Sequence, residues 1–78
     1  MTTPEQIKQY IETGMSCEHV EVAGDGHHFE AVIVSSAFRG KRKVQQHQLV
    51  YAALGDRMRE EIHALSMQTL TPEEWSNR

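Results

Sequence analysis

The chain contains a single cysteine, Cys17, among its 78 residues. One thiol cannot form an internal disulfide, so the sequence indicates a reducing, cytoplasmic compartment. It also lacks any apolar run long enough to span a membrane. Its first residues have neither the basic region nor the apolar core of a secretory signal, and we expect none. The net charge of −3 is not the basic balance of a dedicated nucleic-acid binder.

Motifs for catalysis are missing as well. The sequence has no recognisable Ser/His/Asp grouping, no phosphate-binding glycine loop and no His-Glu-x-x-His motif. A domain this small also has little room for an enclosed pocket. We therefore expect a protein that is not an enzyme. The length, with 38% apolar and 24% charged residues, predicts one globular domain over residues 1–78.

The sequence does contain five histidines. His27 and His28 follow a Gly-Asp-Gly turn, His63 lies between two predicted elements, and His47 lies within a predicted helix. Imidazole titrates near neutral pH and commonly binds metals. This placement predicts exposed ligands that a partner protein completes. The alternative is that each histidine is an ordinary solvated surface residue.

The first half of the chain predicts a helix followed by a hairpin. Thr3-Pro4-Glu5-Gln6 has the spacing of a capping box with proline at the first helical position, and Gly14 is the expected stop. Residues 18–23 alternate polar and apolar side chains, which is typical of a half-buried strand. A Gly-Asp-Gly turn then leads into a second strand over 28–35, so the two runs predict a β-hairpin.

The second half predicts a long helix, a strand and a short helix. Helical spacing covers 44–62, where Gly55 either weakens the helix or marks a bend. Residues 63–70 are the third strand candidate. Thr71-Pro72-Glu73-Glu74 is a second capping box, and Trp75 after it could cover the core. The order α-β-β-α-β-α predicts an α+β fold with one three-stranded sheet and helices packed on a face. Phe38 in the connector over 35–43 is a predicted core anchor.

Several segments carry a resemblance in a constant order. They are Gly24-Asp25-Gly26-His27-His28-Phe29-Glu30, Val34-Ser35-Ser36-Ala37-Phe38-Arg39-Gly40-Lys41, His47-Gln48-Leu49-Val50-Tyr51-Ala52-Ala53-Leu54, Ile62-His63-Ala64-Leu65 and Thr69-Leu70-Thr71-Pro72-Glu73-Glu74-Trp75. In this order and spacing the chain resembles the BolA family, and within it the short bacterial branch linked to acid stress. The resemblance covers nearly the whole chain and implies a mixed three-stranded sheet like that of a type II KH domain.

The resemblance also implies a partner and a cofactor. Family members pair with monothiol glutaredoxins of the CGFS type, around a shared [2Fe-2S] cluster or by a contact without it. The family's cluster ligand in the Ile-His-Ala-Leu segment corresponds to His63. The second ligand comes from the loop between the first two strands, where His27 is the first choice and His28 the alternative. Glutaredoxin cysteine and glutathione would supply the remaining ligands, and no cofactor is required for folding.

Two consequences follow for this ligand set. Histidine must be neutral to bind a metal, so we expect acidification toward pH ~6 to weaken a shared cluster. Alone, the chain is expected to be a monomer or a weak homodimer. Cys17 is expected to be structural, because neighbouring acid raises a thiol pKa.

A DNA-binding regulator is the alternative function. Four basic residues lie within five positions, and His47 follows on the long helix; the candidate contacts are Arg39, Lys41, Arg42, Lys43 and His47. Such a patch could contact phosphates or an acidic protein surface. Many BolA relatives have Arg-His-Arg where this chain has Gln46-His47-Gln48, which removes two charges. No Gly-x-x-Gly is present, so a KH-type RNA clamp is not expected.

Overall fold

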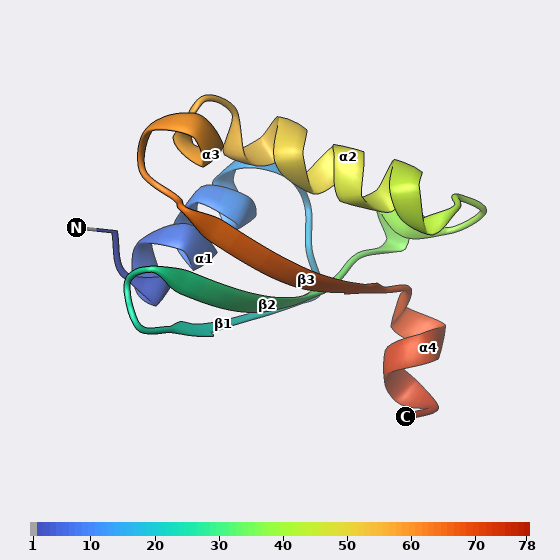
Figure 1. Cartoon of the computed structure of the whole chain (residues 1–78). Coiled ribbons are helices and arrows are strands. Elements are labelled where there is room, and N and C mark those ends of the chain that lie inside the picture. Colours follow the sequence, from blue (N-terminus) through green and yellow to red (C-terminus); the bar gives the residue numbers. More distant parts are fainter. Residues whose placement is uncertain (1) are drawn as a thin grey trace.

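A computed structural model describes residues 2–78 of the chain. The elements are α1 (Pro4–Gly14), β1 (His19–Gly24), β2 (His28–Val34), the 3-10 turn η1 (Ser36–Phe38), α2 (Lys43–Leu54), α3 (Arg57–Glu60), β3 (Ala64–Leu70) and α4 (Pro72–Ser76). The strand order is β1-β2-β3, with β1 antiparallel and β3 parallel to β2. The predicted α+β fold with a mixed three-stranded sheet is confirmed. In Figure 1, α1 and α2 lie together on one side of the sheet.

The core lies between that side of the sheet and the two helices. Alternation in the strands turns every second side chain inward, and helical spacing does the same for α1 and α2. The predicted anchor Phe38 is fully buried. The core cluster consists of Ile7, Ile11, Val20, Phe29, Ala31, Ile33, Phe38, Val50, Leu54 and Ile62.

The helix α1 begins as predicted and ends for a different reason. Thr3 and Gln6 form both bonds of the capping box. Gly14 is the last helical residue, but the cap at Met15 is extended and not left-handed. A Cβ on Gly14 would lie 2.6 Å from the Ala53 carbonyl oxygen. Gly14 therefore permits the close approach of α1 and α2.

The predicted single helix over 44–62 is wrong. Helix α2 ends at Leu54, and Gly55 has a φ of +61°, a conformation that L side chains rarely adopt. The chain turns there and forms the separate helix α3 before it enters β3. Gly55 is therefore a break, and the element order has one helix more than predicted.

The prediction that Trp75 covers the core is also wrong. Figure 1 shows α4 extending from the end of β3, away from the other helices. Trp75 stacks on His19 of β1, with ring centroids 4.7 Å apart. The bidentate contact between Arg39 and Glu73 ties the start of α4 to the connector before α2. Within residues 2–78, no helix is long and apolar enough to cross a membrane.

Candidate functional site

The loop between β1 and β2 is held by Asp25. One carboxylate oxygen of Asp25 accepts hydrogen bonds from the backbone N–H groups of His27 and His28, both at 2.9 Å. These bonds favour the charged carboxylate and hold the pKa of Asp25 below its usual value. The Asp25 N–H in turn donates to the His28 carbonyl. The loop therefore presents its two histidines from a fixed backbone.

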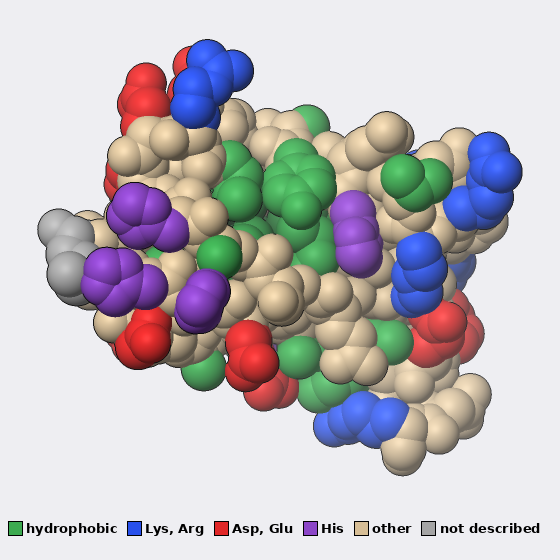
Figure 2. Space-filling view, in the orientation of Figure 1, with side chains coloured by type: hydrophobic (Ala, Val, Ile, Leu, Met, Phe, Trp, Pro, Cys, Tyr) green, Lys and Arg blue, Asp and Glu red, His purple; other side chains and the backbone are tan. Residues whose placement is uncertain are grey.

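The parallel pairing of β2 with β3 brings two distant histidines together. His28 is opposite Ala64 in the register, so the residues just before them, His27 and His63, lie at the same end of the sheet. Their ring centroids are 5.8 Å apart and the rings are inclined by 31°. Both residues are exposed. Figure 2 shows histidine side chains gathered at this end of the molecule.

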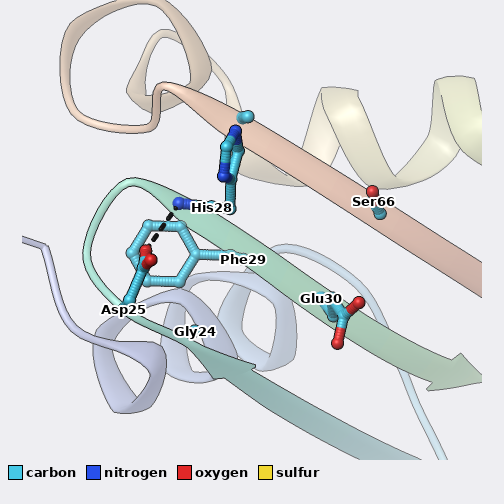
Figure 3. A pocket seen from close by; sticks show the side chains of 7 residues that line it. Gly24, Asp25, His28, Phe29, Glu30 and Ser66 are labelled. Carbon is cyan, nitrogen blue, oxygen red and sulfur yellow. Dashed lines mark hydrogen bonds between the residues drawn. The ribbon is translucent and has the colours of Figure 1, made fainter.

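His28 has a different environment from His27. It lines an open hollow of about 510 Å³ on the sheet face opposite the helices. Figure 3 shows this hollow with His28 and Glu30 on β2 and Ser66 on β3, together with the bond from the His28 N–H to Asp25. The sequence predicts that adjacent histidines point in different directions. The structure accordingly places His27, and not His28, in the ring contact with His63.

The histidine pair can supply only part of a metal coordination sphere. Across residues 2–78, no group of three or more His, Cys, Asp or Glu side chains is arranged to hold a metal ion. Two exposed imidazoles can donate two nitrogen ligands, and other donors must come from another molecule.

The end of α3 is closed by the backbone, since the Glu61 and Ile62 N–H groups donate to the Arg57 carbonyl. The exposed His63 ring is not used for that cap.

Cys17 lies in the segment between α1 and β1 and is partly buried. Its thiol donates a weak hydrogen bond to the Met15 carbonyl. Burial, followed by the charges of Glu18 and Glu12, raises the pKa of Cys17 to about 11. The direction agrees with the sequence prediction, although burial contributes more than the neighbouring acids. The thiolate that a metal would require is therefore disfavoured at neutral pH.

Two of the four basic residues at positions 39–43 are hydrogen-bonded within the protein through their side chains. The Arg39 guanidinium donates to both carboxylate oxygens of Glu73, at 2.9 and 2.6 Å. The Lys43 ammonium donates to the Thr69 carbonyl. Lys41 and Arg42 are exposed. His47 lies on α2, partly buried. Lys41 and Arg42 are therefore the two of the four cations that are most accessible to a ligand.

Gln46 is a buried polar residue of α2. Its side chain is 4% exposed. The amide nitrogen donates to the carbonyls of Phe38 and Lys41, and the amide oxygen accepts from the Thr69 hydroxyl at 2.6 Å. The four-residue spacing from Gln46 to Val50 was the available signal, since Val50 is in the core. Gln46 therefore joins α2, its preceding loop and β3.

Comparisons with known proteins agree on one family. The family described as BolA-like protein matches residues 2–74. The structure of a bolA protein homologue from Coxiella burnetii is similar, with a TM-score of 0.86 and 49% identity over 97% of this chain and 99% of that one. The acid stress protein IbaG of Escherichia coli is 35% identical over 91% of this chain and 86% of that protein.

A third relative extends beyond the matched segment. The DNA-binding transcriptional regulator BolA of Haemophilus influenzae is 46% identical over 57 residues. These residues are 73% of this chain but 55% of the relative, so the match spans little more than half of that protein.

Proposed function

Because the chain belongs to the BolA family, we propose that it pairs with a monothiol glutaredoxin of the CGFS type and shares a [2Fe-2S] cluster with it. His63 and His27 are the proposed ligands. The observation that supports this assignment is the contact between their rings, 5.8 Å apart at an exposed end of the sheet. The proposed role is iron-sulfur cluster handling in the response to iron and acid stress, and it involves no catalysis by this chain.

The donor set fits a shared cluster. A [2Fe-2S] cluster takes four ligands, and two histidines can replace two cysteines on one iron. This chain offers two imidazoles and lacks an accessible low-pKa thiol, since the pKa of Cys17 is raised to about 11. The glutaredoxin cysteine and glutathione would supply two thiolates. Histidine ligation raises the reduction potential of such a cluster relative to ligation by cysteine alone.

The residues of this chain would orient the ligands. Asp25 fixes the backbone of His27 through the bonds in the loop, and the parallel β2–β3 register fixes the start of β3 beside it. Both rings face solvent, so a partner can approach without rearrangement of the core. Two ligands whose backbone is already held lose less conformational freedom on binding than two ligands on mobile segments: the loss falls on the side chains alone.

Visible circular dichroism tests the proposal. A glutaredoxin loaded with a [2Fe-2S] cluster is titrated with the wild-type chain, with His63→Ala and with the matched control His47→Ala. We expect a new spectrum that saturates at one-to-one for wild type and control and is lost for His63→Ala. Unchanged glutaredoxin spectra with the wild-type chain would rule out the shared cluster.

The same titration separates the two loop histidines. His27→Ala should weaken the new spectrum, because His27 is the residue beside His63. His28→Ala should leave it largely intact, because that side chain lines the hollow on the sheet face. The reverse result would assign the loop ligand to His28.

DNA binding is the second candidate function. Lys41 and Arg42 are exposed next to the start of α2, and the Haemophilus influenzae relative is described as a DNA-binding regulator. Binding driven by phosphate contacts weakens steeply with salt. Titration of duplex DNA at two salt concentrations, with the wild type and with Lys41→Ala/Arg42→Ala, tests this function. Binding that is salt-insensitive or unchanged in the double variant would reject it.

A further inference from the structure

We propose that Glu61 and Tyr10, with Thr2 and Arg57, form a clamp that positions His63 beside His27. The clamp consists of these four residues and joins α1 to the segment that enters β3. The inference rests on the proposed function only for the role of His63 as a ligand. The positioning itself is a property of the free protein.

Core packing alone restrains this segment weakly. Across the described stretch 55–62, Ile62 is the one buried residue. Helix α3 has no buried residue, and its Met58, which packs against the core, is only partly buried. Gly55 before it is exposed and has nothing within 4 Å of its Cβ position. Other contacts are therefore needed to set the direction in which the chain reaches His63.

Three hydrogen-bond contacts converge on Glu61, two residues before His63. The Thr2 hydroxyl lies 3.3 Å from the Glu61 carbonyl oxygen and 3.3 Å from its side-chain Oε1. The Tyr10 hydroxyl donates to the same Oε1 at 3.1 Å. Thr2 is only 6% exposed, so its two contacts are partly sheltered from water. Backbone and side chain of Glu61 are thus both held by the N-terminal part of the chain.

Tyr10 also has a second contact with α3. The Arg57 guanidinium lies over its ring, 4.1 Å from the centroid, in a cation–π arrangement. One tyrosine therefore contacts both ends of the segment, Arg57 at the start of α3 and Glu61 just after it. Helix α1, which carries Tyr10, is itself fixed in the core by Ile7 and Ile11. Through these contacts, the fixed helix α1 restrains the segment that leads to His63.

A ligand gains from such support because it must be held at its binding geometry by neighbours outside the site. His27 is already fixed by Asp25 through its backbone. The clamp is the matching support on the other side of the ring pair. Loosening it should leave the fold intact and increase the range of positions open to His63.

The test uses the free protein and nuclear magnetic resonance. Tyr10→Phe removes the hydroxyl and keeps the ring for Arg57, and Glu61→Gln keeps an oxygen acceptor at the same place. Tyr51→Phe on the exposed surface of α2 makes the same chemical change away from the clamp. The measured quantities are amide hydrogen exchange at Glu61 and Ile62, which both donate to the Arg57 carbonyl, and the Overhauser effect between the two histidine rings.

We expect exchange at these two amides to be roughly three-fold faster in Tyr10→Phe, as for loss of one exposed hydrogen bond. The ring-to-ring Overhauser effect should weaken in parallel. Amides of the β1–β2 ladder should keep their rates. Tyr51→Phe should match the wild type, and Glu61→Gln should lie close to it.

Exchange that is unchanged in Tyr10→Phe, or faster by the same factor throughout the chain, would overturn the clamp. Failure of the proposed function is distinguishable. If the wild type forms no shared cluster but Tyr10→Phe still loosens residues 61–62, the clamp stands and the cluster proposal falls. If the cluster forms and the exchange rates do not change, the clamp alone is rejected.

Discussion

The imidazole of His19 stacks on the indole of Trp75, with centroids 4.7 Å apart and planes inclined by 23°. The Nε2 atom of His19 lies 2.5 Å from a carboxylate oxygen of Glu21. On Trp75, the Arg78 guanidinium is a further contact, 3.4 Å from the ring centroid. The stacking of His19 on Trp75 joins the edge strand β1 to α4, two elements far apart in the sequence.

Trp75 fluorescence should report the stacked His19 ring, since Trp75 is the only tryptophan of the chain. Removal of the imidazole uncovers one face of the indole. We therefore expect His19→Ala to shift Trp75 emission to longer wavelength and to increase its quenching by iodide. His47→Ala, on α2, should keep the emission and quenching of the wild type. Emission and quenching in His19→Ala that equal the wild type would contradict the stacking.

Acid should also dissociate the proposed shared cluster. Protonated imidazole cannot bind iron, so ligation by His63 and His27 should weaken as the pH falls. The measurement is the visible circular dichroism of the complex with glutaredoxin during acid titration. The glutaredoxin-bound cluster without this chain is the control. A complex spectrum that persists unchanged to pH ~5 would exclude histidine ligation.

Replacement of Gln46 should destabilise the fold. Gln46→Ala leaves the Phe38 and Lys41 carbonyls and the Thr69 hydroxyl without their partner in a buried site. We expect a loss of about 2–3 kcal/mol in the free energy of unfolding. Gln48→Ala, at an exposed position of the same helix, should change it by less than about 0.5 kcal/mol. Urea denaturation measures the free energy of unfolding of both variants, provided that the m values are equal. A Gln46→Ala midpoint equal to that of the wild type would refute the stabilising role of Gln46.

The contact between Arg39 and Glu73 predicts a small stabilisation of the fold that is lost in acid. The Arg39 hydrogen bond is the main cause that lowers the pKa of Glu73 from its usual 4.5. A carboxyl with a lowered folded pKa stabilises the fold above the unfolded pKa, and this is lost as pH falls through the folded pKa. In Glu73→Gln we expect a shallower loss of stability below pH 4.5. Because the pair is exposed, the effect should be small and shrink in high salt.

A stability curve below pH 4.5 that has the same slope in both proteins would show that the ion pair contributes nothing. Equilibrium denaturation at a series of pH values, at low and high salt, makes the comparison.

Local rules predicted much of the fold. The capping boxes at Thr3 and Thr71 start α1 and α4 as expected, because a hydroxyl and a side chain three residues later satisfy free N–H groups. Alternation predicted the hairpin, and the buried Phe38 agrees with its prediction. The interpretation of residues 44–62 failed at Gly55, because the apolar spacing continues across a break that only the backbone conformation reveals.

Only part of the candidate site could be predicted from the sequence. That His63 and a loop histidine belong together came from a family resemblance, and adjacent positions left His27 and His28 as alternatives. Which of the two rings lies beside His63 depends on the parallel register of β2 and β3, and that ring is His27. Register is set by side-chain packing across the sheet, and no local pattern encodes which ring faces which.

The sequence by itself determined the three strands, the capping boxes that begin α1 and α4 and the α+β class, since capping and alternation depend on neighbours within a few positions. Only the tertiary structure decided that Gln46 bonds to Thr69, that Trp75 stacks on His19 and that Tyr10 holds Glu61. Each of these contacts joins residues far apart in the chain. Their existence depends on how complete elements pack, and that is a property of the whole core rather than of any segment.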